Sequence, residues 1–188
     1  TRHGIGIVAA RHVRISNMGF KNVGIHVLSI EPDWSAGYAP GATDIVFSGG
    51  RSTGWIGRYT DGTTGTQAVY IGTPYGAQSG MNAPIVSGIT IGYLRVLDSR
   101  YGIWSQVTAS GGYRISNVTF IGNRGARGSW WTDSRGVVTC QDTSGFRVIN
   151  NSQPVTAGQG MYMARSLGCS SASASGNVGS GLAGQIRH

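Results

Sequence analysis

The sequence predicts an all-β solenoid, a stack of short parallel strands and turns, and three observations support this fold class. Residues 13–20 read VRISNMGF and residues 113–120 read YRISNVTF, so a strand-like segment nearly repeats along the chain. Both segments alternate apolar and polar residues, as half-buried strands do, and no window shows an apolar stripe of helical period. The chain has 32 Gly and only 12% charged residues, without the three-residue period of collagen. A recurring strand-and-turn unit is typical of a β-solenoid.

The first kind of strand carries an Arg followed by Ile or Val, and it recurs in a weaker form at residues 146–151. Successive side chains of a strand point to opposite faces, so every second one is expected to enter the core. Aligning the copies predicts an inward column of Ile15, Ile115 and Val148. It also predicts a separate inward row of Phe20 and Phe120.

An Asn follows the strand motif in each copy, namely Asn17, Asn117 and Asn150. Stacked asparagines at a bend can hydrogen-bond along the axis and satisfy the backbone groups of the turn. We therefore interpret these three residues as structural.

The second kind of strand begins with Gly, which suits a corner that needs a positive φ. It is predicted at residues 4–7, 24–27, 102–105, 136–139 and 160–163. Further strands are predicted at residues 44–47, 68–71 and 85–91. At about 25 residues per coil, the chain makes roughly seven coils with irregular loops. We expect residues 1–188 to be a single segment of a longer chain, because no cap precedes the first strand.

The chain shows no spacing typical of a metal or cofactor site. Its two cysteines, Cys140 and Cys169, could pair, but free buried thiols are the favoured interpretation. The four His show no metal-ligand spacing with them, so no metal and no cofactor is predicted.

The net charge of +8 comes from 15 Lys and Arg against seven Asp and Glu. It suggests either an anionic partner, such as an acidic polysaccharide, or a local imbalance that the rest of a longer chain offsets. Nucleic acid is not expected, since the Arg residues are scattered rather than clustered. No apolar run is long enough to predict membrane insertion.

The strand at residues 13–20, the Gly-Ile-x-Val strand at residues 24–27 and the Asn at the bend between them carry a family resemblance. They resemble the right-handed single-stranded parallel β-helices of the pectate-lyase-like superfamily, and within it bacteriophage tailspikes and polysaccharide depolymerases. The catalytic motifs of polygalacturonase-type hydrolases and the Asp-Pro-His-Glu motif of alginate epimerases are absent. The resemblance is therefore informative about fold rather than activity.

The resemblance implies an extracellular protein of a virion tail that forms a homotrimer. Such a protein would recognise a bacterial surface polysaccharide or another acidic glycan. Depolymerase activity, as a glycoside hydrolase or polysaccharide lyase, is then expected in the full protein. The alternatives are a secreted bacterial lyase or hydrolase, or a structural or adhesive β-helix without catalysis.

Two outward rows are candidates for glycan binding. Strand parity predicts an outward row that includes His26, Tyr70, Trp104 and Tyr162, and Val138 with them. Aromatic rings stacked on one face can pack against sugars, although loops or a neighbouring subunit could cover the same face.

The second outward row consists of Arg14, Arg114 and Arg147. Arginines in a row can bind carboxylates or phosphates. Solvation, or pairing with carboxylates of a neighbouring chain, is the alternative.

Glycoside hydrolysis usually needs two carboxylates about 5 to 9.5 Å apart. Glu31 and Asp33 are the first candidates, because they follow His26 in a loop that can overhang the aromatic row. Asp61 and Asp98 are further candidates. Each of the four is also a plausible turn residue or ion-pair partner.

Overall fold

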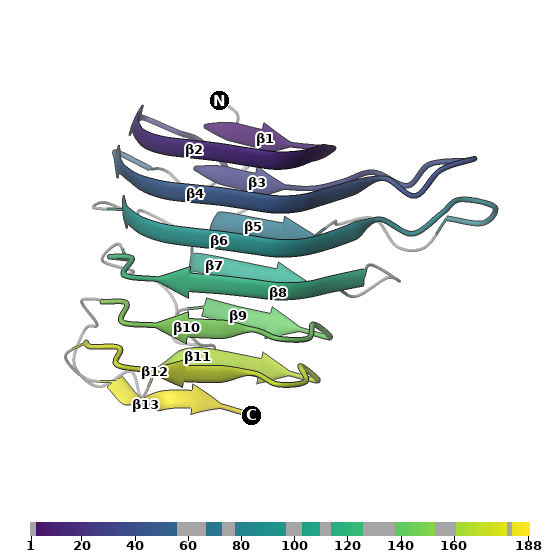
Figure 1. Cartoon of the computed structure of the whole chain (residues 1–188). Helices are drawn as coiled ribbons and strands as arrows, with labels where there is room; N and C mark the ends of the chain where they lie inside the picture. Colours follow the sequence, from purple (N-terminus) through teal and green to yellow (C-terminus); the bar gives the residue numbers. More distant parts are fainter. Residues whose placement is uncertain are drawn as a thin grey trace.

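The computed structural model describes residues 3–55, 67–72, 78–96, 103–109, 114–125, 138–152, 161–179 and 182–188. Within these ranges the protein is all-β, with one seven-stranded and one six-stranded sheet and no helix (Figure 1). Every pairing between named strands is parallel. The predicted all-β class with parallel strands is therefore confirmed.

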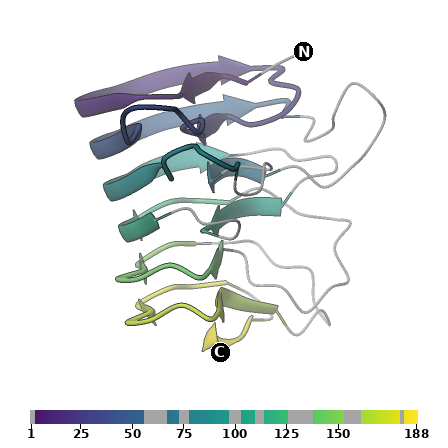
Figure 2. The same ribbon diagram turned by 90° about the vertical axis from the view of Figure 1, so that its right-hand side faces the viewer.

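Consecutive strands alternate between the two sheets. The seven-stranded sheet contains, in order, β1 (Ile5–Ile7), β3 (Leu28–Ile30), β5 (Gln67–Gly72), β7 (Ile103–Thr108), β9 (Val138–Gln141), β11 (Met161–Leu167) and β13 (Leu182–Arg187). The six-stranded sheet contains β2 (Ala10–Lys21), β4 (Gly41–Thr53), β6 (Ile85–Val96), β8 (Arg114–Ile121), β10 (Arg147–Ile149) and β12 (Ser173–Ser175). Figure 2 shows the strands of both sheets stacked from the N-terminal to the C-terminal end.

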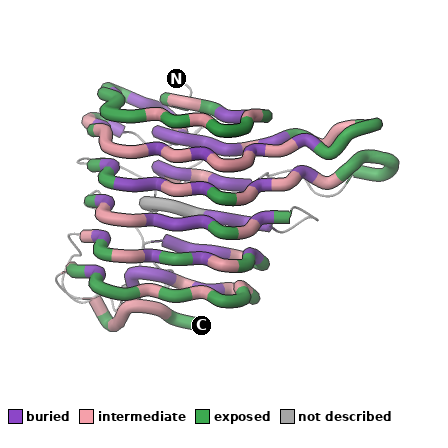
Figure 3. Tube along the Cα trace, viewed as in Figure 1, coloured by how far each residue is buried: buried purple, intermediate pink, exposed green. Residues whose placement is uncertain are grey.

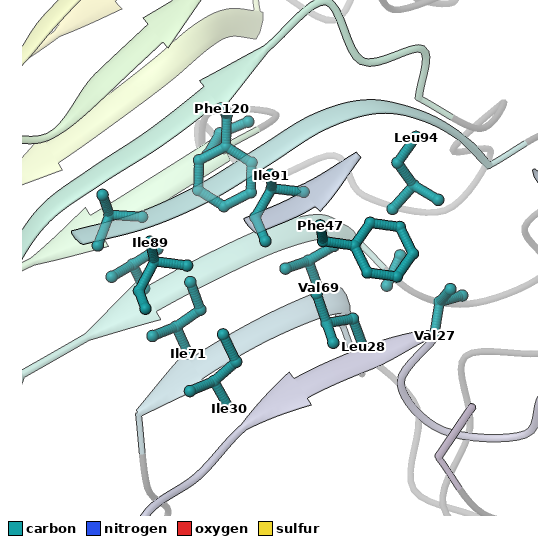
Figure 4. Close-up of a cluster of buried hydrophobic side chains, with 14 of the residues drawn as sticks. Val27, Leu28, Ile30, Phe47, Val69, Ile71, Ile89, Ile91, Leu94 and Phe120 are labelled. Atoms are coloured by element: carbon teal, nitrogen blue, oxygen red, sulfur yellow. The ribbon is translucent and has the colours of Figure 1, made fainter. Parts of the chain in front are cut away.

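The core lies between the two sheets, where apolar side chains of both are buried (Figure 3). Ile71 of the seven-stranded sheet lies near Ile89 of the six-stranded sheet, and Val69 lies near Phe47 (Figure 4); all four are fully buried. Burial of apolar surface contributes about 25 cal/mol per Å². In-register parallel strands repeat this contact from one strand to the next, so the core is a set of continuous columns.

One predicted column is correct in part. Ile15 and Val148 do share a column, which consists of Ile15, Phe47, Ile91, Phe120, Val148 and Ala174. Ile115 is buried, as predicted, but it lies opposite Val86 in a different column. Phe20 lies opposite Ser52, so the predicted row of Phe20 with Phe120 is also wrong.

The physical reason is that the strands of this sheet bend twice. One line of bends consists of His12, Asp44, Gly88, Asn117, Gly145 and Ser171, and the other of Asn17, Gly49, Tyr93, Gly122, Asn150 and Gly176. All have φ between 52° and 71°, the left-handed region. The motif Arg-Ile-Ser-Asn ends at the second bend in its first copy and at the first bend in its second copy. The two copies are therefore one bend out of register.

At several bends a glycine makes room for the side chain of the bend residue on the preceding strand of the sheet. A Cβ on Gly145 would lie 2.6 Å from Oδ1 of Asn117, and one on Gly49 would lie 2.6 Å from Oδ1 of Asn17. The side chains of Asn17 and Asn117 thus lie over a glycine on the next strand, whereas His12 and Asp44 are adjacent bend residues that contact each other.

A buried asparagine ladder does run along the axis, but with other residues than predicted. Asn123, Asn151 and Asn177 are each at most 5% exposed. The backbone N–H of Asn123 donates to Oδ1 of Asn151, and that of Asn151 donates to Oδ1 of Asn177, at 2.9 and 2.8 Å. Their amide groups donate to backbone carbonyls, which satisfies buried polar groups at this corner.

The glycine-led strands are also shifted. Gly4 lies one residue before β1, which pairs with β3 so that Ile5 is opposite Leu28. Gly4 is therefore not equivalent to Gly24, and Gly102, Gly136 and Gly160 lie outside the described residues. The strands predicted at residues 44–47, 68–71 and 85–91 fall within β4, β5 and β6.

Cys140 and Cys169 form a disulfide, so the expectation of free thiols is wrong. Cys140 is in β9, and Cys169 follows the adjacent strand β11, which brings the Cα atoms to 6.5 Å. The two positions are not in register with each other, but the pairing of β9 with β11 places them within disulfide reach. No helix long and apolar enough to cross a membrane is present among the described residues.

Candidate functional site

His26, Tyr70 and Glu31 form a cluster at the start of the seven-stranded sheet. His26 precedes β3, Glu31 directly follows β3, and Tyr70 lies in β5 opposite Ser29. The rings of His26 and Tyr70 stack with centroids 5.2 Å apart and planes 16° apart. Three of the predicted site residues are therefore brought together.

His26 is only 3% exposed, which agrees with the alternative that this part of the predicted outward row is covered. Its Nδ1 lies 2.6 Å from the carbonyl oxygen of Gln67, and a carbonyl can only accept, so Nδ1 carries the proton. Burial lowers the pKa of His26 to about 4, against a smaller raising effect of this hydrogen bond. The imidazole is thus neutral at physiological pH.

Glu31 is half-buried, and burial raises the pKa of its carboxyl group. A hydrogen bond from Ser29 lowers the pKa in part, and the charge of Asp33 raises it further. Oε1 of Glu31 lies 3.9 Å from Nε2 of His26. This buried oxygen has no hydrogen-bond partner in the described structure. Asp33 itself is exposed.

His3 completes the cluster, and the sequence-based prediction missed it. Its ring centroid lies 4.9 Å from that of His26. The potential ligand atoms of His3, His26 and Glu31 all lie within 4.8 Å of one another. No short motif signals this arrangement, because the three residues meet only when β1 pairs with β3.

The other predicted aromatic residues do not share a row with Tyr70. Tyr70 is in register with Ser29 and Gln106, whereas the backbone of Trp104 lies opposite Ala68. Tyr162, half-buried in β11, lies opposite Gly184 in β13. Two of the predicted catalytic residues, Asp61 and Asp98, lie outside the described residues, and so does the side chain of Trp104.

Val138, which was predicted to point outward with these residues, is fully buried. It shares a column with Val69 through Ser105, and Val69 faces the core. The predicted single aromatic platform is therefore wrong in its register.

The predicted arginine row is not a row either. Arg14 and Arg147 share a register position, but Val46, Thr90 and Thr119 lie between them. Arg14 is engaged with Asp44, its Nη2 lying 2.8 Å from Oδ1. Contacts with His12 and Arg14 lower the pKa of Asp44.

Arg114 lies elsewhere on the six-stranded sheet, opposite Ile85. It lines a surface hollow of about 370 Å³ together with Asp142 and several serines. The one-bend offset between the two Arg-Ile-Ser-Asn copies accounts for this displacement.

A different set of arginines does form a row. Arg51 of β4 lies opposite Arg95 of β6, and Arg95 pairs with Arg124, which follows β8. All three are exposed, and no ion pair involves them among the described residues. We call Arg51, Arg95 and Arg124 the arginine ladder. Each arginine stands two residues after the second bend of its strand. The equivalence of the three arginines can therefore be predicted only when the positions of the bends are known.

No protein-family model matches the chain, and searches of the curated proteins and of the solved structures find no match.

Proposed function

We propose that the protein is a right-handed parallel β-helix that binds an acidic polysaccharide along the arginine ladder. The alternation of consecutive strands between two parallel sheets supports a chain that coils continuously. Crossover connections between parallel strands are right-handed in about 98% of cases, which supports the hand.

The arginine ladder is the observation that carries the proposal. Adjacent strands are spaced at about 4.8 Å, so three guanidinium groups follow one another along the axis. Their charges have no carboxylate partners among the described residues, and the chain as a whole carries a net charge of +8. A polymer with regularly spaced carboxylate, sulfate or phosphate groups can engage all three at once.

We propose a glycan rather than a nucleic acid as the ligand, because the arginines of the chain are scattered along the sequence and form no recognised nucleic-acid motif. Proteins that bind single strands without sequence preference combine basic grooves with several aromatic stacking positions. Beside the ladder the described surface offers one such ring, Tyr93, which is 60% exposed and lies two residues before Arg95. The exposed ring of Tyr93 can pack against the face of a sugar next to the arginines.

The family resemblance extends the proposal to a bacterial surface polysaccharide and a tailspike-like homotrimer, virion-borne or secreted. Glycoside hydrolysis in the full protein would usually need two carboxylates. Glu31 and Asp33 remain the candidates, because a carboxyl group of raised pKa beside a second acid is a pattern of general acid catalysis.

The test compares two triple variants of equal charge. Arg51→Gln/Arg95→Gln/Arg124→Gln removes the ladder, and Arg114→Gln/Arg147→Gln/Arg165→Gln removes three scattered arginines. Binding to polygalacturonate, neutral dextran and poly(dT) is measured by biolayer interferometry. The proposal predicts a loss of roughly tenfold to a hundredfold for polygalacturonate in the ladder variant, with little change in the matched control.

Equal losses in both triple variants would show only a nonspecific charge effect. Tighter binding of poly(dT) than of polygalacturonate would instead indicate a nucleic-acid surface. Either result would overturn the proposed function.

A further inference from the structure

We propose that His3, His26 and Glu31 form a site for one divalent transition-metal ion of the zinc class. The site joins the segment before β1 to the two ends of β3. It is independent of the arginine ladder, which lies on the six-stranded sheet. With a metal bound, Glu31 is an ionised ligand and does not serve as the general acid.

The ligand types favour this class of metal. Two imidazole nitrogens and one carboxylate oxygen form a three-residue set that Zn²⁺ uses when a fourth position stays open to water. Imidazole ligands suit zinc, copper, iron and nickel, whereas magnesium and calcium prefer oxygen ligands alone.

The surrounding contacts orient the ligands. A metal-binding His usually donates its other ring N–H to a carbonyl or carboxylate. Nδ1 of His26 makes this contact with the carbonyl of Gln67 at 2.6 Å, and Nε2 faces Oε1 of Glu31 at 3.9 Å. Tyr70 holds the ring plane by stacking. The imidazole is therefore presented as a neutral ligand with its tautomer fixed.

The distances require a small contraction. Zinc bonds of about 2.0–2.2 Å place tetrahedral ligand atoms roughly 3.4 Å apart, and those of the cluster now lie within 4.8 Å. Nε2 of His26 and Oε1 of Glu31 need to approach by only a few tenths of an ångström. His3 is exposed and lies ahead of the first strand, so its side chain has room for the larger movement.

A buried carboxylate oxygen without a hydrogen-bond partner is costly, and a cation would offset this cost. The competing explanation is a proton held by the Glu31 carboxyl group, which would leave the cluster with no metal affinity. The two explanations differ in whether one ion binds per chain.

The experiment titrates the whole 188-residue chain, freed of metal by a chelator, with Zn²⁺ in competition with a chromophoric chelator. The proposal predicts one Zn²⁺ per chain and a higher melting temperature. Co²⁺ should give the visible absorption of a low-coordinate site. Excess Mg²⁺ should not displace either ion.

The variants are Glu31→Gln and His3→Ala, with His12→Ala and His188→Ala as controls that remove histidines outside the cluster. Glu31→Gln and His3→Ala should each weaken Zn²⁺ binding by roughly tenfold to a hundredfold or more. Both controls should bind like the unmodified chain. Glu31→Gln removes the charge of a carboxylate whose Oε1 has no hydrogen-bond partner in the described structure. Thermal melting of each metal-free variant checks that the variant folds.

Three results would overturn the proposal. These are the absence of a one-to-one complex, unchanged affinity in Glu31→Gln, and equal loss in the His12→Ala control. The last would assign binding to scattered surface histidines.

Discussion

Arg51 of β4 lies directly opposite Arg95 of β6, so two like charges occupy the same position on adjacent parallel strands. Arg124 repeats the charge at the next position along the axis. Like charges directly opposite each other destabilise a sheet. The ladder therefore costs stability in the free protein, and an anionic ligand would offset that cost.

Neutralising the middle of the ladder should stabilise the fold. Arg95→Gln removes both like-charge contacts, so the free energy of unfolding should rise by up to about 1 kcal/mol at low salt. The gain should shrink at high salt, because salt screens exposed charges. Thermal melts at two salt concentrations measure both effects. Arg147→Gln, opposite Thr119, is the control and should change neither; a lower stability of Arg95→Gln would contradict the repulsion.

The inward position of Ile115 gives a test of register. Ile115 is 4% exposed, whereas its neighbour Arg114 is exposed. Ile115→Asp buries an unpaired carboxylate and should cost several kcal/mol, about 3–5. Arg114→Asp introduces the same group one residue earlier, on the outward face, and should cost less than about 1 kcal/mol. Denaturant unfolding measures the two losses, and similar values would argue against the register of β8.

Gly145 gives a test of whether a bend glycine is needed beside the Asn117 side chain of the adjacent strand. Gly145 has a φ of 65°, and an added Cβ would lie 2.6 Å from Oδ1 of Asn117. Gly145→Ala should therefore cost roughly 2–3 kcal/mol, from backbone strain of about 1–2 kcal/mol together with the overlap.

The double variant Asn117→Gly/Gly145→Ala separates these two contributions. Removing the Asn117 side chain relieves the overlap but leaves the strain at position 145. The double variant should thus be more stable than the sum of the single changes predicts. Strict additivity would show that the side chain of Asn117 can move aside.

His26 should make the fold sensitive to acid. Burial lowers its pKa from 6.5 to about 4, so between these values the unfolded chain binds more protons than the folded chain. The free energy of unfolding should accordingly fall as the pH drops from 6.5 to about 4, by up to roughly 3 kcal/mol.

Glu31 has the opposite effect. Its raised pKa means that the folded chain holds a proton above pH 4.5, where the unfolded chain has lost it, so its contribution to stability decreases as the pH rises. Glu31→Gln should therefore steepen the loss of stability on acidification, and His26→Gln should flatten it. Denaturant unfolding of the metal-free chain across this pH range is the measurement. An unchanged pH profile in His26→Gln would contradict the buried neutral imidazole, and His188→Gln, at an exposed His, is the control.

The architecture could be predicted because its signal is local. Alternating apolar residues at 13–20 and 113–120, and the many glycines, indicate strands and turns wherever they occur. The register could not be predicted, because each strand of the six-stranded sheet bends twice and either bend accepts Asn. Val86, opposite Ile115, resembles Ile15 in character, so composition does not distinguish the two columns.

The site was predictable only in part. Strand parity predicts His26 and Tyr70, the loop position after His26 predicts Glu31, and adjacent strands do bring the three together. His3 was missed because its contact depends on the pairing of β1 with β3. Arg51, Arg95 and Arg124 were missed because their equivalence follows from the bends at Gly49, Tyr93 and Gly122 rather than from sequence similarity around the arginines.

The salt dependence of glycan binding tests the arginine ladder most directly. Contacts between arginines and a polyanion release counterions, so affinity falls linearly with the logarithm of salt concentration, with a slope set by the number of contacts. The dissociation constant for polygalacturonate is measured over a series of NaCl concentrations. Arg51→Gln/Arg95→Gln/Arg124→Gln should reduce the magnitude of the slope by roughly two, while the equally charged variant Arg114→Gln/Arg147→Gln/Arg165→Gln keeps the slope of the unmodified chain. Identical slopes in all three proteins would contradict binding along the ladder.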